Sequence, residues 1–268
     1  MPHRIVFSDI DGTLLNVHRE LSEYTISEIK RIKDTVPVVL ISSRMPSAMI
    51  HLQDELNIRN QPIICYNGGL ILVEGKPVHS TFIAPNIIAS IDTFNSNQQF
   101  HMSLYHNDDW FVPEMDFWAN REATNTKVSP VVKPTKHTID DWENQQKGAH
   151  KIMCMGEEAH INDLFIYLKD TFDDALHLYR SKPTYIEIAH KDISKLTAID
   201  FLLKTHFDIP ISEAVAFGDN YNDIAMLKAA GTGVAVANAK PEVKDIADIV
   251  TLSGKEDGVA NYIHKNIL

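Results

Sequence analysis

The chain of 268 residues has little of what secreted, membrane or nucleic-acid-binding proteins require. It has two cysteines, Cys65 and Cys154, each inside a short apolar run, so we expect two buried reduced thiols. No stretch approaches the roughly 18 uninterrupted apolar residues of a membrane span, and no long apolar segment precedes Ser8 as in a secretory signal. Basic residues are few: 25 Lys and Arg against 36 Asp and Glu give a net charge of −11, unlike a nucleic-acid-binding surface. We therefore expect a cytoplasmic protein without nucleic-acid or membrane partners.

What the sequence does contain is an alternation of strand-like and helix-like patterns. Apolar runs typical of buried strands stand at 4–7, 36–41 and 62–66. A helical pattern with Ser22 as a plausible N-cap separates the first two runs. This alternation is typical of parallel α/β architecture, and the length allows one large domain or two modest ones.

The pattern changes after the third run. A β-hairpin turning at Glu74 and Gly75 is expected first. Residues 85–190 then mix helical patterns, strands with antiparallel-looking spacing and a polar middle, before the strand–helix alternation resumes. We therefore predict an α/β fold with a doubly wound, mostly parallel sheet, built from residues 1–84 and 191–268 and interrupted by an inserted α+β domain.

The strongest chemical signal is the run DIDGTLL at 9–15, directly after the first strand-like segment. If the strand continues through this run, Asp9 and Asp11 present their carboxylates on the same side. They lie at the carboxyl end of a strand, where open α/β sheets bind ligands. Two close carboxylates need a shared proton or a cation such as Mg²⁺, which binds carboxylate and phosphate oxygens. Taken alone, the same residues fit a polar turn equally well.

Three further segments bear on this signal. Residues 42–44 (Ser-Ser-Arg) end the second strand with groups that bind phosphate, although a polar strand end is also ordinary. Lys195 stands in the first turn of a predicted helix, where the helix dipole disfavours a cation unless an anion lies nearby. Residues 218–223 (GDNYND) follow another strand, and either Asn220 or Asn222 could be a simple N-cap.

In this order, DxDGTLL, S-x-R, K and GDNxND resemble the four motifs of the haloacid dehalogenase-like superfamily. The long insert, GDNYNDIAML and the tail AVANAKPEVKDIAD are similar to its Cof-type, type IIB branch, which consists mainly of sugar-phosphate and related phosphatases. The resemblance covers a Rossmann-like core at 1–84 and 191–268, and the insert at 85–190 corresponds by position to the substrate-selecting cap. Two departures leave every reactive group in place: Ser42-Ser43 replaces Thr-Gly in the second motif, and Leu196 replaces the usual glycine after the lysine.

The resemblance implies Mg²⁺-dependent hydrolysis of a phosphate monoester, with a small phosphorylated metabolite as the partner and an aspartyl-phosphate on Asp9. Asp11 would protonate the leaving oxygen and then accept a proton from water, which calls for a pKa raised toward neutrality. The Asp9 and Asp219 carboxylates and the Asp11 backbone carbonyl would hold the metal. Asp223 would orient a metal-bound water or Lys195.

The resemblance also implies which groups contact the substrate. The transferring phosphoryl group would be bound by Ser42, Lys195, Asn222 and the backbone amides of Ile10 and Asp11. Arg44 is expected nearby, and no direct contact with the phosphoryl group is assigned to it. In the cap, the candidate contacts, for each of which packing is the commoner role, are Trp110, Trp118, Arg180, Tyr185 and Glu187.

Two other functions fit the same motifs. A phosphomutase of the phosphomannomutase kind also forms an aspartyl-phosphate, but it needs additional cations in the cap, where Arg121 and Arg180 are the only arginines. A non-catalytic phosphometabolite sensor would be marked by a lost nucleophile or metal ligand, and every such position is intact. Hexose phosphates are the expected substrates, with pyridoxal phosphate, flavin mononucleotide and other phosphate esters as alternatives. The sequence does not indicate an oligomeric state.

Overall fold

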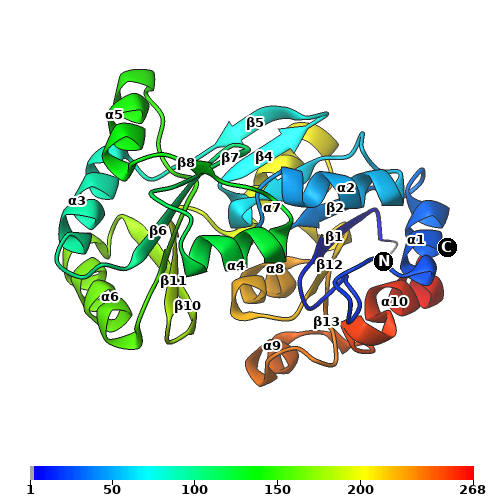
Figure 1. Ribbon diagram of the computed structural model, residues 1–268. Helices are drawn as coiled ribbons and strands as arrows, with labels where there is room; N and C mark the ends of the chain where they lie inside the picture. The colour runs from blue at the N-terminus through cyan, green and yellow to red at the C-terminus, as the bar shows by residue number, and fades with distance from the viewer. Residues whose placement is uncertain (1–2) are drawn as a thin grey trace. The chain divides into compact units, whose positions relative to one another are not determined.

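The computed structural model describes residues 3–268, which form two compact units (Figure 1). Unit 1 comprises the residues up to Arg44, Met49–Val78 and Ser194–Leu268, and unit 2 comprises Met45–Ala48 and His79–Ile193. The chain changes unit near residue 79, before the helix at which the sequence placed the change. The reason is that Ile83 exchanges two backbone hydrogen bonds with Ala149, at 2.7 and 3.0 Å, and so already belongs to unit 2.

Unit 1 is built on an eight-stranded sheet in the order β14-β13-β12-β1-β2-β3-β4-β5. Its strands are β1 (Ile5–Asp9), β2 (Val38–Ile41), β3 (Ile63–Cys65), β4 (Leu70–Val73), β5 (Lys76–Ser80), β12 (Ala214–Gly218), β13 (Thr232–Ala235) and β14 (Ile249–Val250). The strands from β14 to β3 pair in parallel, and β4 pairs antiparallel to β3. The predicted α/β class and the mostly parallel sheet are confirmed.

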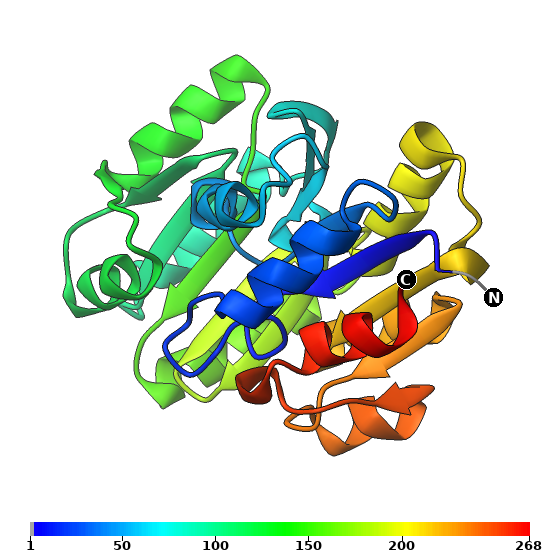
Figure 2. The same ribbon diagram turned by 90° about the vertical axis from the view of Figure 1, so that its right-hand side faces the viewer.

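Helices cover both faces of this sheet. They are α1 (Glu23–Ile32), α2 (Ser47–Leu56), α7 (Lys195–Leu202), α8 (Ile224–Ala229), α9 (Pro241–Ile246) and α10 (Gly258–Asn266). Because side chains alternate along a strand, Phe7 and Val39 point to the face that packs against Ile199, Met226 and Val243 of α7, α8 and α9. Helices α1 and α10 contact each other and lie on the opposite face (Figure 2).

Local signals in unit 1 act as the sequence predicted. The Ser22 hydroxyl accepts the amide of Thr25 at 3.0 Å and caps α1. Glu74 and Gly75 form the hairpin turn between β4 and β5 with positive φ angles of 51° and 75°, as tight two-residue turns require. Both cysteines, Cys65 in unit 1 and Cys154 in unit 2, are free and buried.

Unit 2 has a six-stranded, mostly antiparallel sheet in the order β10-β11-β9-β6-β7-β8. Its strands are β6 (His101–His106), β7 (Asp109–Val112), β8 (Val131–Val132), β9 (Lys151–Met155), β10 (Leu176–Lys182) and β11 (Tyr185–His190). Its helices are α3 (Pro85–Asn95), α4 (Phe117–Thr126), α5 (Thr135–Gln145) and α6 (Glu158–Phe172).

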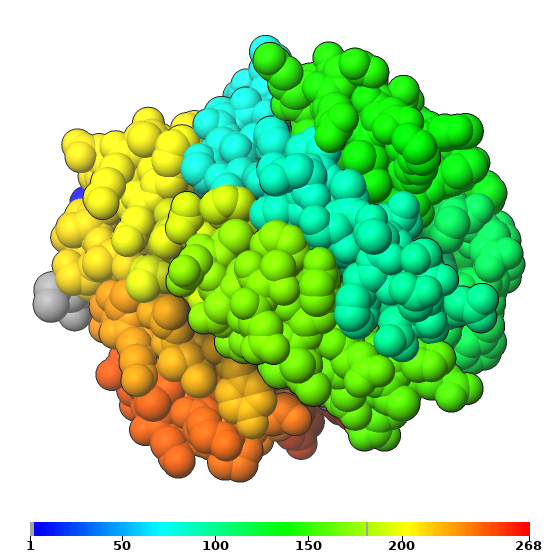
Figure 3. Space-filling view, turned by 90° about the vertical axis from the view of Figure 1, so that its left-hand side faces the viewer, coloured from blue at the N-terminus to red at the C-terminus, as the bar shows by residue number. Residues whose placement is uncertain are grey.

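Three of these helices bury one face of the unit 2 sheet. Ile88 of α3, Trp142 of α5 and Leu164 of α6 belong to one apolar cluster with side chains of β6, β9 and β11. Phe94 of α3 stacks on Tyr167 of α6 at 4.4 Å between ring centroids, and Figure 3 shows this helical side of the unit. Within residues 3–268, no helix has the length and apolar character needed to cross a bilayer.

Candidate active site

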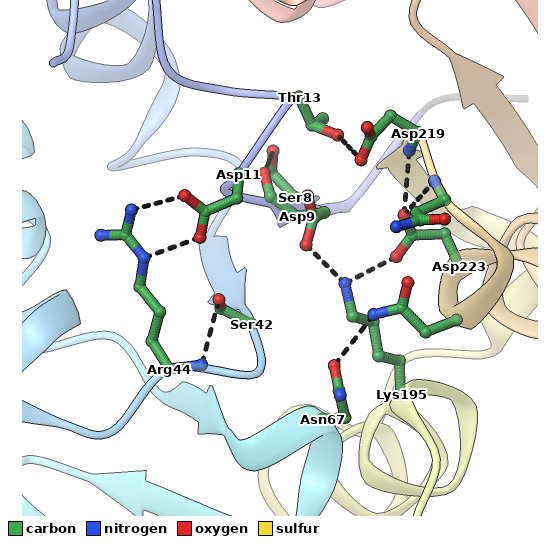
Figure 4. A network of polar contacts seen from close by, with 12 residues as sticks. Ser8, Asp9, Asp11, Thr13, Ser42, Arg44, Asn67, Lys195, Asp219 and Asp223 are labelled. Carbon is green, nitrogen blue, oxygen red and sulfur yellow. Dashed lines mark hydrogen bonds and ion pairs between the residues drawn. The ribbon is translucent and has the colours of Figure 1, made fainter. Parts of the chain in front are cut away.

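Three neighbouring parallel strands of unit 1 end at the same edge of the sheet. Strand β1 ends at Asp9, β2 is followed by Ser42, and β12 is followed by Asp219. Because β1 pairs with both β2 and β12 in parallel, these three ends lie side by side. Helix α7 begins beside them and brings Lys195, so segments from four parts of the chain converge in one polar network (Figure 4).

Lys195 lies at the centre of this network. Its Nζ donates to Asp9 Oδ1 at 2.5 Å and to Asp223 Oδ1 at 2.6 Å, and its side chain is fully buried. Ser194 caps α7 through a hydrogen bond from the Thr197 amide, which fixes Lys195 in the first turn. Burial opposes the charged ammonium, but the two carboxylates outweigh it and raise the pKa of Lys195.

A glycine lets α7 approach the sheet so closely. Gly68 has a φ of +112°, and a Cβ at this position would lie 2.6 Å from the Ser194 carbonyl oxygen. Only glycine adopts this conformation and leaves this space without strain. Gly68 therefore helps to set the position of the capped helix start that carries Lys195.

Asp223 is held by hydrogen bonds at both of its oxygens. Oδ1 accepts the Lys195 ammonium, while Oδ2 accepts the backbone amides of Asp219 and Asn220 at 2.9 and 3.0 Å. Asp223 is completely buried, so these bonds compensate for its lost hydration. This carboxylate thus orients both Lys195 and the loop that carries Asp219.

The acidic groups of the site fit a hard divalent cation. Carboxylate oxygens of Asp9, Asp219 and Asp223 lie within 4.8 Å of one another, and a single ammonium, that of Lys195, bonds two of them. Burial raises the pKa of Asp9 to about 8, and the charges of Asp223 and Asp219 add to this effect against Lys195. Burial and then Asp223 raise the pKa of Asp219 to about 6. Because burial and neighbouring carboxylates disfavour the ionised forms of Asp9 and Asp219, a bound Mg²⁺ with oxygen ligands would stabilise those ionised forms.

The placement of Asp11 differs from the sequence expectation. Strand β1 stops at Asp9, Gly12 has a φ of +86°, and the Asp11 carboxylate points away from Asp9 toward Arg44 (Figure 4). Arg44 Nε donates to Asp11 Oδ2 and Nη2 to Oδ1, both at 2.7 Å, and Arg19 Nη2 donates to Oδ1 at 3.2 Å.

These contacts reverse the expected charge behaviour of Asp11. Burial acts to raise the pKa of its carboxyl, but the hydrogen bonds and charges of Arg44 and Arg19 hold that pKa below the ordinary value. The expectation that Asp9 and Asp11 present their carboxylates together, and that the pKa of Asp11 is raised, is wrong for this structure. The cause is the pair of guanidinium groups of Arg44 and Arg19. They attract the Asp11 carboxylate, whereas the neighbouring Asp9 carboxylate would repel it.

The predicted phosphoryl-binding residues lie around the same strand ends. Ser42 is buried, and its hydroxyl accepts the Arg44 amide at 3.2 Å. The Asn222 amide group donates to Asn67 Oδ1 at 3.1 Å. Ile10 is fully buried and belongs to the apolar core.

Asn67 is a site residue that sequence reasoning missed. It follows β3 with a left-handed backbone (φ 56°, ψ 22°), and its backbone N–H donates to the Ser42 carbonyl at 2.8 Å. It thereby joins the segment after β2 to Asn222. The Asn-Gly-Gly run at 67–69 is a turn signal, but it does not indicate the contact with Asn222.

In unit 2, four of the proposed cap contacts make packing interactions. Trp110 is buried, donates to Ser103 Oγ at 3.0 Å and stacks on Tyr105. Arg121 lies over the Trp118 ring at 4.5 Å. Arg180 lies over the Phe165 ring and donates to the Pro183 carbonyl, and Lys182 lies over the Tyr185 ring. Glu187 lies on β11.

Known proteins resemble the chain over almost all of its length. Residues 6–263 match the family model described as haloacid dehalogenase-like hydrolase. A putative phosphatase of Haemophilus influenzae is 33% identical over 97% of each chain, and the putative phosphatase YxeH of Bacillus subtilis is 29% identical over 99% of each. A crystal structure of a haloacid dehalogenase-like hydrolase from Bacteroides thetaiotaomicron superposes with a TM-score of 0.89 at 25% identity, over 98% of this chain and 99% of that one.

Proposed function

The chain belongs to the haloacid dehalogenase-like hydrolases, and we propose that it hydrolyses phosphate monoesters through an aspartyl-phosphate on Asp9, with Mg²⁺ as cofactor. The observation that carries this proposal is the group formed by Asp9, Lys195 and Asp219, which the ends of β1 and β12 and the start of α7 bring together. Asp9 and Lys195 are buried, and Asp219 is half-buried. The relatives named putative phosphatases, which match nearly the whole chain, support the same reaction class.

In this proposal Asp9 is the nucleophile. One carboxylate oxygen attacks phosphorus and the ester oxygen leaves; water then attacks the same phosphorus, releasing inorganic phosphate and restoring the carboxylate. Lys195, 2.5 Å from Asp9, would orient the nucleophile and compensate the charge of the phosphoryl oxygens. Ser42, Asn222 and the amides of Ile10 and Asp11 would complete the cradle for that group.

The metal would be held by the Asp9 and Asp219 carboxylates and the Asp11 carbonyl. When bound, Mg²⁺ supplies the positive charge that lets an anionic nucleophile approach an anionic phosphate. Asp223 would act through its neighbours, because its two oxygens already hold Lys195 and the amides of Asp219 and Asn220.

Asp11 would protonate the leaving oxygen and then take a proton from the attacking water. Its contacts with Arg44 and Arg19 add a requirement to this role. An ionised carboxylate held by two guanidinium groups has no proton to give, so the Asp11 side chain would have to leave them before it acts.

The proposed substrate is a small phosphorylated metabolite, with sugar phosphates as the first class to test, and residues 85–190 as the cap that selects it. A phosphomutase would need free cations in that segment. Its two arginines are engaged within unit 2, Arg121 with Trp118 and Arg180 with Phe165 and Pro183, which favours hydrolysis over phosphoryl return.

A phosphate-release screen over a panel of phosphomonoesters, with and without Mg²⁺, tests the proposal. We expect Mg²⁺-dependent release of inorganic phosphate from at least one ester and no isomerised hexose phosphate. The Asp9→Asn variant should fold normally and lose turnover. Retention of a tenth of wild-type activity by this variant would rule out the nucleophile assignment, and an isomerised product without free phosphate would favour the mutase.

A further inference from the structure

Two arginines of unit 1 surround one carboxylate beside the proposed nucleophile. Arg44 donates two hydrogen bonds of 2.7 Å to the Asp11 carboxylate, and Arg19 donates a third at 3.2 Å. The side chains of Arg44, Arg19 and Asp11 are 16%, 55% and 42% exposed, so the group lies at an accessible surface of the unit. Two guanidinium groups around a single carboxylate have the composition of an anion-binding site.

The chain segment that carries Arg19 is a hydrogen-bonded turn over residues 16–20. Asn16 Oδ1 accepts hydrogen bonds from the backbone N–H groups of His18 and Glu20 at 2.8 and 3.1 Å. The backbone N–H of Asn16 donates to the Glu20 carbonyl at 2.9 Å. Within this closed turn Arg19 takes a left-handed backbone with a φ of 62°, an unusual conformation for arginine. The local fold therefore sets the backbone position from which the Arg19 side chain reaches Asp11.

We propose that Arg19 and Arg44 form a subsite for a second anionic group of the substrate, a carboxylate or a phosphate carried by the leaving group. Asp11 occupies this subsite in the free chain. The inference rests on the proposed function, which requires the Asp11 side chain to leave the two arginines. An anion from the substrate then replaces Asp11, and each guanidinium keeps an anionic oxygen as its hydrogen-bond partner.

The location of the subsite limits the substrates that can use it. Asp9 and Asp11 are two residues apart, so their Cα atoms are at most about 7.6 Å from each other. A second anion on the arginines therefore lies within the length of one small metabolite from the phosphorus attacked by Asp9. This favours short phosphorylated acids and compact sugar bisphosphates over neutral sugar phosphates of the same size.

Matched substrate pairs test the proposal. Glycerol 3-phosphate and 3-phosphoglycerate differ by a terminal carboxylate, and fructose 6-phosphate and fructose 1,6-bisphosphate differ by a second phosphate. In one of the two pairs, we expect kcat/KM for the ester with the additional anionic group to be about tenfold or more higher than for the ester without it. This ratio is the effect of one charge-assisted hydrogen bond. Which pair shows it distinguishes a carboxylate from a phosphate. Arg19→Ala should reduce this ratio to near one, and Arg19→Lys should keep part of it.

Arg59→Ala is the matched control, because Arg59 is an arginine of unit 1 that is 52% exposed and paired with Asp54. It should leave the ratio unchanged. A wild-type ratio near one in both pairs, or a ratio that survives Arg19→Ala while both rates fall together, would overturn the subsite.

A binding measurement separates this proposal from the proposed function. If no ester is turned over, the proposed function fails, and calorimetric titration of the metal-free chain with the same pairs still decides the subsite. Tighter binding of an anionic member that depends on Arg19 supports the subsite. Equal binding of both members, or no binding of either, contradicts it.

Discussion

Replacing Lys195 with methionine removes the cation at the centre of the site while keeping a side chain of similar length. Its ammonium serves two buried carboxylates, those of Asp9 and Asp223, at 2.5 and 2.6 Å. Removing one partner of a buried ion pair costs about 3–5 kcal/mol, because the remaining charge stays buried without compensation. We therefore expect Lys195→Met to lose about 3 kcal/mol of unfolding free energy, roughly 6–12 °C in the melting temperature of unit 1.

The loss should depend on pH in a defined direction. The folded-state pKa of Asp9 is raised to about 8, so its neutral form stabilises the fold at low pH and this contribution disappears as the pH rises through 8. Without Lys195 the pKa of Asp9 should rise further, and protonation then relieves the buried charge. The deficit of Lys195→Met relative to wild type should be smaller at pH 6 than at pH 9.

Chemical denaturation of metal-free protein at the two pH values is the assay. Lys228→Met, an exposed lysine in the last turn of α8, is the control and should stay within about 0.5 kcal/mol of wild type. Adding Asp223→Asn to Lys195→Met should recover part of the loss, since one buried charge is removed. A Lys195→Met deficit below about 1 kcal/mol, or an equal deficit at both pH values, would refute the reasoning.

Two further predictions concern the metal. The increase in melting temperature caused by Mg²⁺ should be larger at pH 8.5 than at pH 5.5, because the carboxyls of Asp9 and Asp219, with pKa values of about 8 and 6, must lose their protons to bind it; equal increments in a thermal-shift assay would contradict this. Gly12→Ala should weaken Mg²⁺ binding about tenfold or more by calorimetry, since its Cβ would lie 2.4 Å from Asp219 Oδ2. Gly75→Ala is its control, with a φ of +75° but no atom within 4 Å, and should strain the backbone without changing metal affinity.

The convergence of the site could be predicted because it follows from parallel strand order. Residues after the ends of β1, β2 and β12 must lie together once those strands are neighbours, and the Ser194 cap fixes where α7 begins. The strand–helix alternation and the helix cap are short-range patterns that are visible in the sequence, and the order of the four motifs supplied the expectation that they meet. The α/β class and the buried thiols were predictable for the same reason.

The orientation of side chains within the site could not be predicted in the same way. Whether Asp11 faces Asp9 depends on where β1 stops, on the turn at Gly12 and on which cation is nearest. Arg19 and Arg44 reach Asp11 from separate loops, and no spacing in the sequence indicates that contact. Tertiary partners of this kind decide the charge state of a carboxylate. For this reason the pKa of Asp11 was expected to be raised, whereas its arginine partners lower it.

Chemical trapping of the intermediate tests the central claim most directly. Borohydride reduces an aspartyl-phosphate to homoserine, which mass spectrometry locates in the chain. With Mg²⁺ and a turned-over ester, we predict homoserine at position 9, and none without the ester or in Asp9→Asn. Rapid phosphate release with an unmodified Asp9, or with the modification at another aspartate, would contradict the account.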